Sequence, residues 1–574
     1  MGKENEIATA PYNFVSLPKA VLASPMDGNA VTDEERTLNY RTHVLEKGQF
    51  SGRIELTIET KTPVFIGTGV GTAEDKDLEL FFSPTGVPMI PGSSLRGMIK
   101  NLFKIVTCGA MRAGEDYHDR VFYYRTLADR NKRMGELYRN EMSVQNDRRD
   151  IAEPQAAAGY LVQITGDQGY YICPTGKPAE IIPYGSNRQI ENTVIWGEPG
   201  SGEADCHTGR MSGKRTYTRH CNPDWMQRIP VPVQVVKTYR EDRDRKGVDL
   251  LTSCRLLDAD ARVFTGQDDI QSVVPCFYKM EKGEVKHFGF GRFYRLAYHM
   301  SVSDHVIDMD VPVVDYADAL FGRKELWASR LSFTDAMPEE EPQMDAPDYP
   351  KILSSPKPTA VQLYLEQKHG ADRLAHWDSE KVSIRGYKLY WHQKNGADWH
   401  GEKPKNGDER RKIQPVKKGT KFFANIRFER LSEDELGALL KTLRINGDHL
   451  CCKIGKGKSL GLGSIEITSS LVLMDMKASY LNVFDEMGEW NRAESTADNA
   501  KIQKLITAFD NYVKDREINY DKSIEELRHM LDWNNTEIRG WKEEIEQMSI
   551  QDKRKPFQKR WILPTALEVG KKKP

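Results

Sequence analysis

The stretch RIELTIETKTPVFIGTG, residues 53–69, decides how the first half of the chain folds. Its first eight residues alternate apolar and polar side chains, with Ile54, Leu56 and Ile58 on one side. A period of two is typical of a strand that buries one face. The glycines that follow predict a loop. The sequence therefore predicts a half-buried strand that leads into a glycine-punctuated loop.

A helix is predicted next, in SSLRGMIKNLFKIV at residues 93–106. It follows Pro91-Gly92, and Ser93 or Ser94 is the expected N-cap. Apolar residues recur at helical spacing, and three basic residues recur every four positions, namely Arg96, Lys100 and Lys104. Free amides, serine hydroxyls and the positive end of the helix dipole suit a phosphate group. The alternative is an ordinary capped amphipathic helix with a solvated basic edge.

The rest of the chain divides by composition into further segments. Residues 1–50 are polar and irregular, and predict a surface arm. The order from residue 51 is strand, loop and helix, then a long excursion, then strand, helix and strand. We expect these units: 51–109 as the first part of the core, 110–317 as an inserted subdomain of short strands, 318–336 as a core strand, 337–420 as a basic loop region, 421–470 as the last part of the core, and 471–574 as a mostly helical extension.

Charge and composition restrict the classes of function. The formal net charge of the 574 residues is −1, so any affinity for nucleic acid must come from local patches. No apolar run approaches the roughly 18 residues of a membrane helix, and the N-terminus does not resemble a signal peptide. The 8 cysteines lack the spacing of a disulfide framework. We expect a cytoplasmic protein with reduced thiols and no membrane partner.

The segment Lys381–Lys421 is the strongest nucleic-acid candidate by composition. Twelve basic residues stand against four acidic ones, interleaved with aromatic residues. Aromatic rings could stack on unpaired bases while Lys and Arg contact phosphates. The predicted stacking residues are Tyr387, Tyr390 and Trp391, and the predicted phosphate contacts are Arg385, Arg410, Arg411 and Lys412. The alternative is a flexible charged loop.

A second glycine-rich loop, IGKGKSLGLG, spans residues 454–463. It lacks the earlier glycine of a P-loop, and Leu460 stands where a dinucleotide-binding motif needs glycine, so ATP binding is not expected. Backbone approach at the glycines and charge from Lys456 and Lys458 predict contact with an RNA backbone, through Gly455 and Gly457 in particular. A purely structural glycine turn is the alternative.

Taken together, four segments resemble the RAMP superfamily, in particular the backbone subunits of type III CRISPR effector complexes. They occur in family order: TPVFIGTG, IPGSSLRGMIKNLF, LFG followed by ASRLSFTDA, and IGKGKSLGLGSIEI. APYNFVSLPKAVL and ILPTA resemble a long single-copy subgroup with a large insertion.

The resemblance implies an α+β fold with an RRM-like (ferredoxin-like) core, a large insertion, a thumb-like loop at 337–420 and a helical C-terminal extension. It also implies guide RNA, complementary target RNA and other subunits of the complex as partners.

The resemblance further implies a catalytic aspartate in the first glycine loop, where Asp77 is the first candidate and Asp75 the second. A carboxylate can orient the ribose 2′-hydroxyl, accept its proton or hold a divalent ion, for which Mg²⁺ is the expected cofactor of cleavage. Three functions stay open: cleavage of paired target RNA, binding without cleavage, and processing of guide precursors, which usually uses a histidine.

Two pairs of residues contain ligand types that zinc prefers: Cys206 with His207, and His220 with Cys221. Their spacing matches no common zinc motif, and adjacent residues on a strand point to opposite faces. We therefore expect unliganded surface residues here, with zinc as the alternative.

Overall fold

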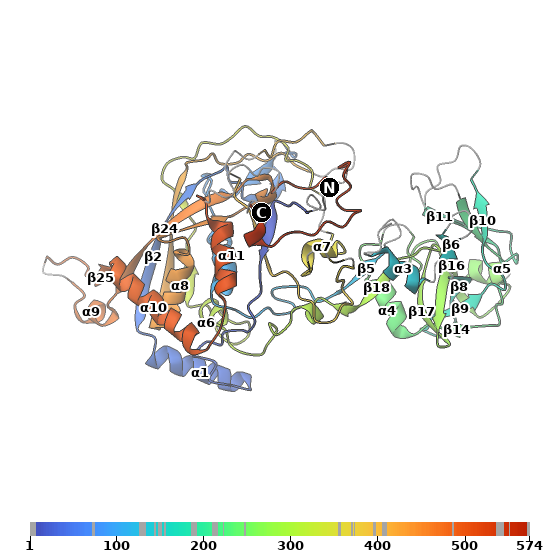
Figure 1. Cartoon of the computed structure of the whole chain (residues 1–574), viewed down its shortest axis with the longest axis horizontal. Helices are drawn as coiled ribbons and strands as arrows, with labels where there is room; N and C mark the ends of the chain where they lie inside the picture. The colour runs from blue at the N-terminus through green and yellow to red at the C-terminus, as the bar shows by residue number, and fades with distance from the viewer. Residues whose placement is uncertain are drawn as a thin grey trace.

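The computed structural model has a larger lobe that contains both termini and a smaller lobe beside it (Figure 1). It describes residues 7–71, 75–125, 134–142, 145–146, 152–153, 156–184, 192–208, 216–221, 223–245, 248–353, 357–368, 371, 373–393, 398–404, 410–484, 487–534, 545–549 and 551–570.

The larger lobe is built on an antiparallel sheet with the strand order β19-β22-β2-β24-β23. Its elements are β2 (Phe50–Thr60), α2 (Gly92–Val106), β19 (Leu331–Phe333), β22 (Lys421–Leu431), α8 (Glu433–Leu443), β23 (His449–Lys453) and β24 (Ser464–Met474). If β23 is left aside, the strands lie across the sheet in the order β19, β22, β2 and β24, which are the second, third, first and fourth of the four along the chain. Helix α2 follows the first of them, and helix α8 follows the third. This is the ferredoxin-like βαββαβ arrangement, so the expected α+β core is confirmed.

Period-two patterning explains why the helices cover only one face of this sheet. Ile54, Leu56 and Ile58 of β2 are buried, as are the apolar faces of α2 and α8. The intervening residues of β2 lie on the opposite, polar face. A further helix, α10 (Asn499–Asp515), packs against α8, where a Cβ added to Gly437 would lie 2.0 Å from the Leu505 carbonyl oxygen.

A buried ion pair fixes α8 to the segment before β19. Arg330 donates to both carboxylate oxygens of Glu435 at 2.6 and 2.9 Å. Glu435 also accepts from the Ser432 N–H at 2.9 Å, which completes a capping box at the start of α8. Burial raises the pKa of Glu435, but Arg330 and His43 outweigh it and lower this pKa to about 2. The carboxylate is therefore ionised in the interior.

The smaller lobe has a hydrophobic core of its own within residues 160–290. One sheet has the order β14-β9-β8-β16-β15, with β17 on β16; these include β14 (Ile229–Pro230), β9 (Tyr171–Pro174), β15 (Leu256–Leu257) and β17 (Glu284–Gly289). A four-stranded sheet has the order β10-β13-β12-β11, with β10 (Glu180–Pro183), β13 (Thr216–His220), β12 (Ala204–Thr208) and β11 (Asn192–Trp196). The longest strands are β8 (Ala157–Ile164) and β16 (Ile270–Glu281). Helices α4 (Val233–Glu241) and α5 (Ala259–Thr265) complete it.

The N-terminal segment differs from the predicted surface arm. Strand β1 (Tyr12–Val15) is fully buried and pairs with β21 (Tyr387–Tyr390). Ile7 bridges Ile562 near the other end of the chain. The arm prediction was wrong for this part because a short buried strand shows no periodicity. Helix α1 (Asp33–Glu46) does project from the lobe, at the bottom of Figure 1.

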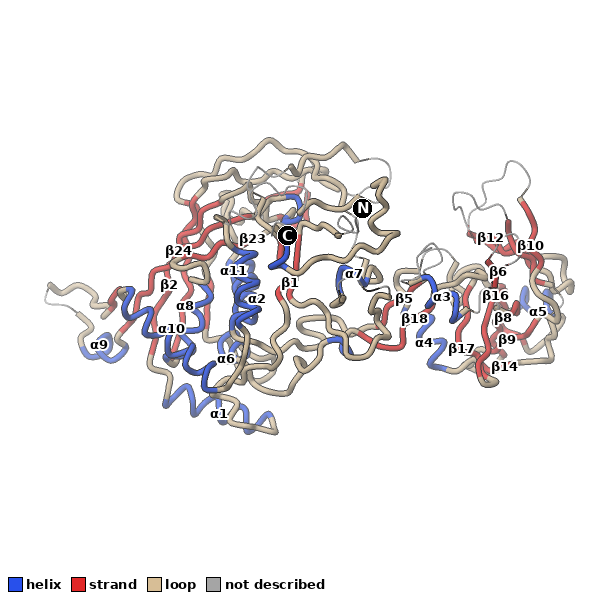
Figure 2. Tube along the Cα trace, in the orientation of Figure 1, coloured by secondary structure: helices blue, strands red, loops and turns tan. Residues whose placement is uncertain are grey.

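Long loops cross the upper part of the larger lobe (Figure 2). The segment 337–420 contains short elements where it is described, with β20 (Met337–Pro338), α7 (Val361–Tyr364) and β21 among them. Trp377, Trp391 and Trp399 are buried. The segment therefore packs along the core over much of its length.

The described part of the C-terminal extension contains α9 (Met476–Leu481), β25 (Glu494–Thr496), α10 and α11 (Asp521–Leu531), and its described residues after α11 are largely irregular. Among the described residues, the model contains no helix with the length and apolarity needed to traverse a bilayer.

Candidate functional site

Three segments that are far apart in the sequence meet at one place, which we name the three-loop junction. They are the first glycine loop (65–81), the segment 410–416 and the glycine-rich loop 454–463. Within the first loop, β3 (Gly67–Gly71) pairs with β4 (Glu79–Phe81). The Lys456 N–H donates to the Phe65 carbonyl at 2.8 Å, and the Lys456 ammonium pairs with Glu79.

The segment 410–416 forms the other side of the junction. The Lys412 N–H donates to the Asp77 carbonyl at 2.6 Å, and Leu78 forms a parallel bridge with Lys412. The Arg411 guanidinium donates to the Gly69 carbonyl at 2.8 Å. The basic segment and the acidic loop, which the sequence analysis treated separately, are therefore parts of one structure.

Asp75 is held by this arrangement. The Lys412 ammonium lies 3.1 Å from its Oδ2, and its Oδ1 accepts the Asp77 N–H at 2.9 Å. The hydrogen bond from Lys412 and the one from Asp77 lower the pKa of Asp75 below its usual value. Asp75 is thus an ionised carboxylate that stabilises the turn.

Asp77 is the more accessible of the two candidate carboxylates. It is exposed, and its Oδ2 lies 3.5 Å from the Tyr349 hydroxyl, at the limit of a hydrogen bond. Glu79, in contrast, is buried and accepts the Gly69 N–H at 2.9 Å in addition to its pair with Lys456. Geometry therefore favours Asp77 as the carboxylate that could reach a substrate.

The glycine-rich loop contacts the chain itself at several of its glycines. A Cβ at Gly455 would lie 2.3 Å from the Phe65 carbonyl oxygen, and one at Gly457 would lie 2.6 Å from Leu462. Both residues have positive φ, +80° and +71°. Lys458 donates to the Gly455 carbonyl at 2.7 Å, and burial lowers the pKa of its ammonium. Lys456, with 52% of its side chain exposed, is the more available cation of this loop.

The start of α2 differs from the predicted serine cap. Pro91 is the N-cap, and the Gly92 N–H donates to the Asp335 carboxylate at 2.7 Å. Ser93 is exposed and Ser94 half-buried in the first turn. An aspartate thus already occupies the positive end of this helix, which leaves less room there for a phosphate.

The basic stripe of α2 faces protein rather than open solvent. The Arg96 guanidinium donates to the Phe321 carbonyl at 2.7 Å and stacks over the Phe321 ring. Lys104 is buried in an ion pair with Asp116. Burial, followed by the nearby charges of Lys104 and Arg96, lowers the pKa of Lys100. Segments from elsewhere in the chain cover much of the stripe, so the alternative of a solvated basic edge does not hold. Contact of Arg96 and Lys100 with RNA stays a prediction.

Helix α2 nevertheless adjoins the glycine-rich hairpin. The Met98 sulfur lies 3.2 Å from the sulfur of Cys452 on β23, the strand that leads into the loop. The strand, helix and loop motifs from the sequence therefore occupy one region of the larger lobe.

The sequence profile of the RAMP superfamily matches residues 57–152. This part of the chain is therefore similar to the RAMP superfamily. The matched residues include the end of β2, the first glycine loop and α2, and the first glycine loop is one of the three segments of the three-loop junction. Similarity to this superfamily implies a CRISPR-associated RNA-binding protein. A search of curated proteins finds no match.

Several predicted RNA contacts lie in the interior of the protein. Arg385 is buried and donates to the backbone carbonyls of Leu365, Leu563 and Pro564. Tyr387 and Trp391 are buried as well. Arg385 therefore holds the C-terminal segment in place. Composition alone could not distinguish buried from exposed members of this segment.

Arg410 lies at the other end of the same segment. It is half-buried and donates to the carbonyls of Pro350 and Glu402. Tyr390 is half-buried beside Tyr12. Arg411 and Lys412 remain at the junction.

The four candidate zinc residues do not converge on one point. Cys206 and His220 face the same side, with Sγ and Nδ1 3.5 Å apart. His207 points away from them and contacts the Tyr184 hydroxyl through Nδ1 at 3.0 Å. All four residues, including Cys221, are buried, so the expectation of surface residues was wrong. Burial lowers the pKa of His220 to about 4, which keeps its ring neutral.

A cleft between the lobes is the site that the sequence reasoning missed. Its volume is about 1830 Å³, and it is lined by the smaller lobe and by residues 357–359 and Arg560 of the larger. Among the residues that the structure describes, nine lysines and arginines line it against four acidic residues: Arg120, Arg125, Arg243, Arg245, Lys286, Arg292, Arg295, Lys357 and Arg560. Their sequence positions are scattered, so no local charge run revealed them.

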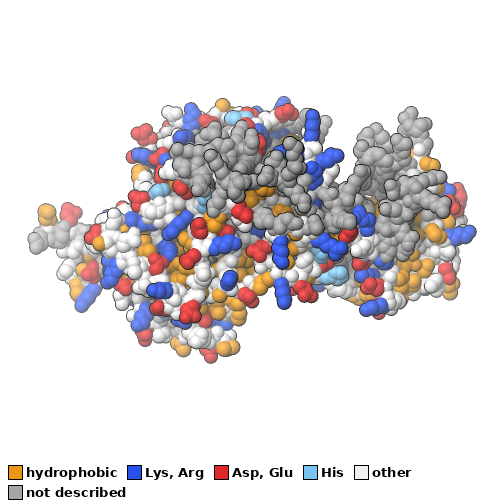
Figure 3. Space-filling model, viewed as in Figure 1, with side chains coloured by type: hydrophobic (Ala, Val, Ile, Leu, Met, Phe, Trp, Pro, Cys, Tyr) orange, Lys and Arg blue, Asp and Glu red, His pale blue; other side chains and the backbone are white. Residues whose placement is uncertain are grey.

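Part of that charge is already paired within the cleft. Arg295 lies 3.4 Å from Asp242, and Lys286 lies 2.8 Å from Glu141. Arg120 is exposed and stacks over Phe122, and Arg243 is exposed. On the face drawn in Figure 3, Lys and Arg side chains are interspersed with Asp and Glu. The cleft is thus a local concentration of basic and aromatic groups on a molecule of nearly neutral charge.

Proposed function

We propose that this RAMP protein is a backbone subunit of a type III CRISPR effector complex that holds guide RNA and contacts the target RNA paired with it. The observation that carries the proposal is the three-loop junction. There the family-matched loop, the glycine-rich loop and the 410–416 segment bring Lys456, Arg411 and Asp77 together. Cations beside an accessible carboxylate suit a ribose-phosphate chain.

We further propose that Asp77 acts in cleavage of the target RNA. The 2′-hydroxyl must be deprotonated and aligned with the scissile phosphate, and an exposed carboxylate can accept or orient that proton. Asp75 has a different role, because its charge is neutralised by Lys412. Asp75 instead positions the Asp77 turn, whose N–H it accepts.

The donor set fits Mg²⁺ as the cofactor of this step. Mg²⁺ in phosphoryl-transfer sites is commonly held by one or two carboxylates together with substrate phosphates. Asp77 supplies such a carboxylate, whereas Glu79 is engaged by Lys456 and Gly69. When bound, Mg²⁺ would stabilise negative charge on the phosphate. The chain's own contribution is to fix the Asp77 backbone through Lys412.

A cut also needs a nucleotide that is splayed out of the A-form helix. The inter-lobe cleft supports the proposal here, because its basic and aromatic lining suits single-stranded RNA. We propose that the inter-lobe cleft binds the unpaired portion of the RNA.

Binding without cleavage remains the second candidate. It is favoured by the engagement of the carboxylates next to Asp77, since Lys412 pairs with Asp75 and Lys456 pairs with Glu79. Processing of guide precursors is less well supported. His392 contacts the Ser464 hydroxyl at 3.0 Å next to the glycine-rich loop, but it is buried away from solvent.

The test uses the complex purified from cells that also carry the neighbouring subunits and a CRISPR array. We expect a short RNA of defined 5′ sequence to copurify with the wild-type chain. Asp77→Ala and Asp77→Asn should abolish target cleavage while target binding persists. Retained cleavage in both variants would remove Asp77 from the mechanism.

Two further outcomes would overturn larger parts of the proposal. A wild-type complex that carries no RNA would exclude the backbone role. Metal-independent cleavage of a repeat-containing precursor by the isolated chain would instead support the processing function.

A further inference from the structure

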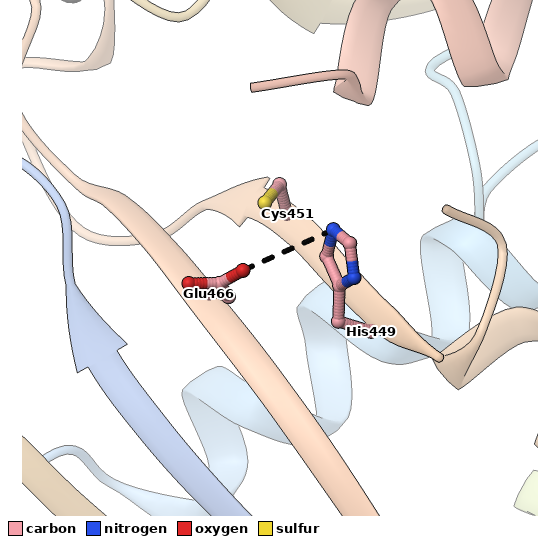
Figure 4. Close-up of side chains that lie close together, drawn as sticks. All are labelled: His449, Cys451 and Glu466. Carbon is pink, nitrogen blue, oxygen red and sulfur yellow. Dashed lines mark ion pairs between the residues drawn. The ribbon is translucent and has the colours of Figure 1, made fainter. Parts of the chain in front are cut away.

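Three metal-ligating side chains meet on the polar face of the ferredoxin-like sheet, apart from the three-loop junction. They are His449 and Cys451 of β23 and Glu466 of β24 (Figure 4). Their ligand atoms all lie within 4.8 Å of one another. His449 and Cys451 are two residues apart on one strand and share a face, and Glu466 is the register partner of Cys451. Strand pairing therefore fixes the three side chains relative to one another.

The His449 ring is oriented as in many metal sites. Its Nδ1 lies 2.9 Å from the Asp448 carboxylate, so an N–H at this position leaves the lone pair on Nε2. A carboxylate behind the imidazole fixes the tautomer and the orientation of metal-bound histidines. Nε2 lies 3.9 Å from Glu466 Oε1, which is too long for a hydrogen bond. It is close to the roughly 3.4 Å that separates two ligands at bond lengths of about 2.0–2.1 Å from one tetrahedral zinc ion.

Neighbouring residues orient Glu466, and the three side chains differ in their exposure to solvent. Lys61 pairs with Glu466 Oε2 at 3.0 Å, which leaves Oε1 directed toward His449. Cys451 is buried, whereas the side chains of His449 and Glu466 are 24% and 28% exposed. The thiol is thus the buried member of the cluster, and the other two side chains are partly open to solvent.

The donor atoms of these three side chains indicate which metal ion they would bind. An imidazole nitrogen, a thiol sulfur and one carboxylate oxygen suit zinc, whereas Mg²⁺ and Ca²⁺ prefer oxygen ligands. We propose that His449, Cys451 and Glu466 bind one zinc ion, with the fourth position open to water or to an oxygen atom of a ligand. Zinc here would tie β23 to β24, the two strands that support the glycine-rich loop.

The experiment uses the full chain, stripped of metal by a chelator and titrated with Zn²⁺ or Co²⁺. We expect one equivalent of Zn²⁺ to survive gel filtration and to raise the melting temperature. With Co²⁺ we expect the charge-transfer absorption of a thiolate ligand. Cys451→Ser should remove that absorption, and His449→Ala and Glu466→Gln should each weaken zinc binding at least tenfold.

Matched controls separate this site from adventitious binding. Cys254→Ser changes an exposed thiol in the smaller lobe and should alter nothing. Asp448→Asn should weaken binding about tenfold, as substitutions behind a metal-bound histidine do. If Cys451→Ser fails to fold, the half-buried His449→Ala and Glu466→Gln decide the matter. Zinc binding that is unchanged in both of them, or no retained zinc in the wild type, would overturn the proposal. Neither result depends on whether the protein cuts RNA.

Discussion

The Lys412 ammonium lies 3.1 Å from the Asp75 carboxylate, which joins two residues 337 positions apart in the sequence. Through this pair, the basic segment 381–421 supports the first glycine loop, which contains Asp75 and Asp77. The pair turns two separate sequence motifs into one site, and it distinguishes the roles of Asp75 and Asp77.

Lys412→Gln should slow target cleavage while leaving RNA binding within a few-fold of wild type. The substitution removes the cation that holds Asp75 and loosens the turn that presents Asp77. Cleavage rate and target affinity of the assembled complex are the measurements. Lys417→Gln, an exposed lysine of the same segment, is the matched control and should cleave normally. Equal rates for the two variants would show that the Lys412–Asp75 pair does not support cleavage.

Glu435→Gln should destabilise the larger lobe at neutral pH by about 3–5 kcal/mol, because it leaves Arg330 buried without its partner. The pKa of Glu435 is about 2 in the folded chain against an ordinary 4.5. Its contribution to stability is therefore complete above about pH 4.5 and is lost as the pH falls through about 2.

Urea unfolding of wild type and Glu435→Gln between about pH 2 and pH 7 measures the difference between their free energies of unfolding. It should be constant above about pH 5 and shrink below about pH 4.5. Glu429→Gln, on the exposed side of β22, should show no such difference. If the difference in free energy of unfolding between wild type and Glu435→Gln does not change with pH, Glu435 is not an ionised carboxylate in the interior.

Gly455→Ala should lower both the melting temperature and the retention of RNA. The new Cβ would lie 2.3 Å from the Phe65 carbonyl oxygen and force the glycine-rich loop away from the first glycine loop. Gly447→Ala is the control, because that residue also has positive φ, yet its Cβ meets no heavy atom within 4 Å in the described part of the chain.

Left-handed strain alone costs about 1–2 kcal/mol, so the two variants share that destabilisation. Gly455→Ala should be destabilised further, as measured by thermal unfolding. Equal stability of the two would mean that the loops do not need close contact.

Arg120→Ala combined with Arg243→Ala should weaken binding of single-stranded RNA and reduce its dependence on salt. For each phosphate that the protein no longer neutralises, the slope of log K against log salt should become shallower by about 0.7. Filter binding at several salt concentrations gives this slope. Arg262→Ala, exposed on α5 and outside the cleft lining, is the control. An unchanged slope in the double variant would exclude the cleft as an RNA path.

The ferredoxin-like core was largely predictable from the sequence. The alternation of Ile54, Leu56 and Ile58 and the apolar spacing of α2 are local signals, and local periodicity determines which face of an element is buried. The capping box at Ser432 likewise depends only on residues that are close together in the chain. The aspartates were found by their position in the family motif, and the structure places them at the junction.

The members of the 381–421 segment show where local signals end. Arg385, Tyr387 and Trp391 are of the types that bind RNA, but they pack beneath β1 and the C-terminal stretch, which come from both ends of the chain. Their burial depends on packing between residues hundreds of positions apart. Composition carries no information about such packing.

By itself, the sequence determined the secondary structure of the core and the chemical groups available to it, because both depend on residues close together in the chain. Only the tertiary structure decided which groups are accessible. Asp77 is exposed and Asp75 is paired because Lys412 reaches one of them, and the cleft and the His449–Cys451–Glu466 cluster exist because strands and lobes bring distant residues together. Accessibility and proximity are properties of packing, and packing is set by the whole chain at once.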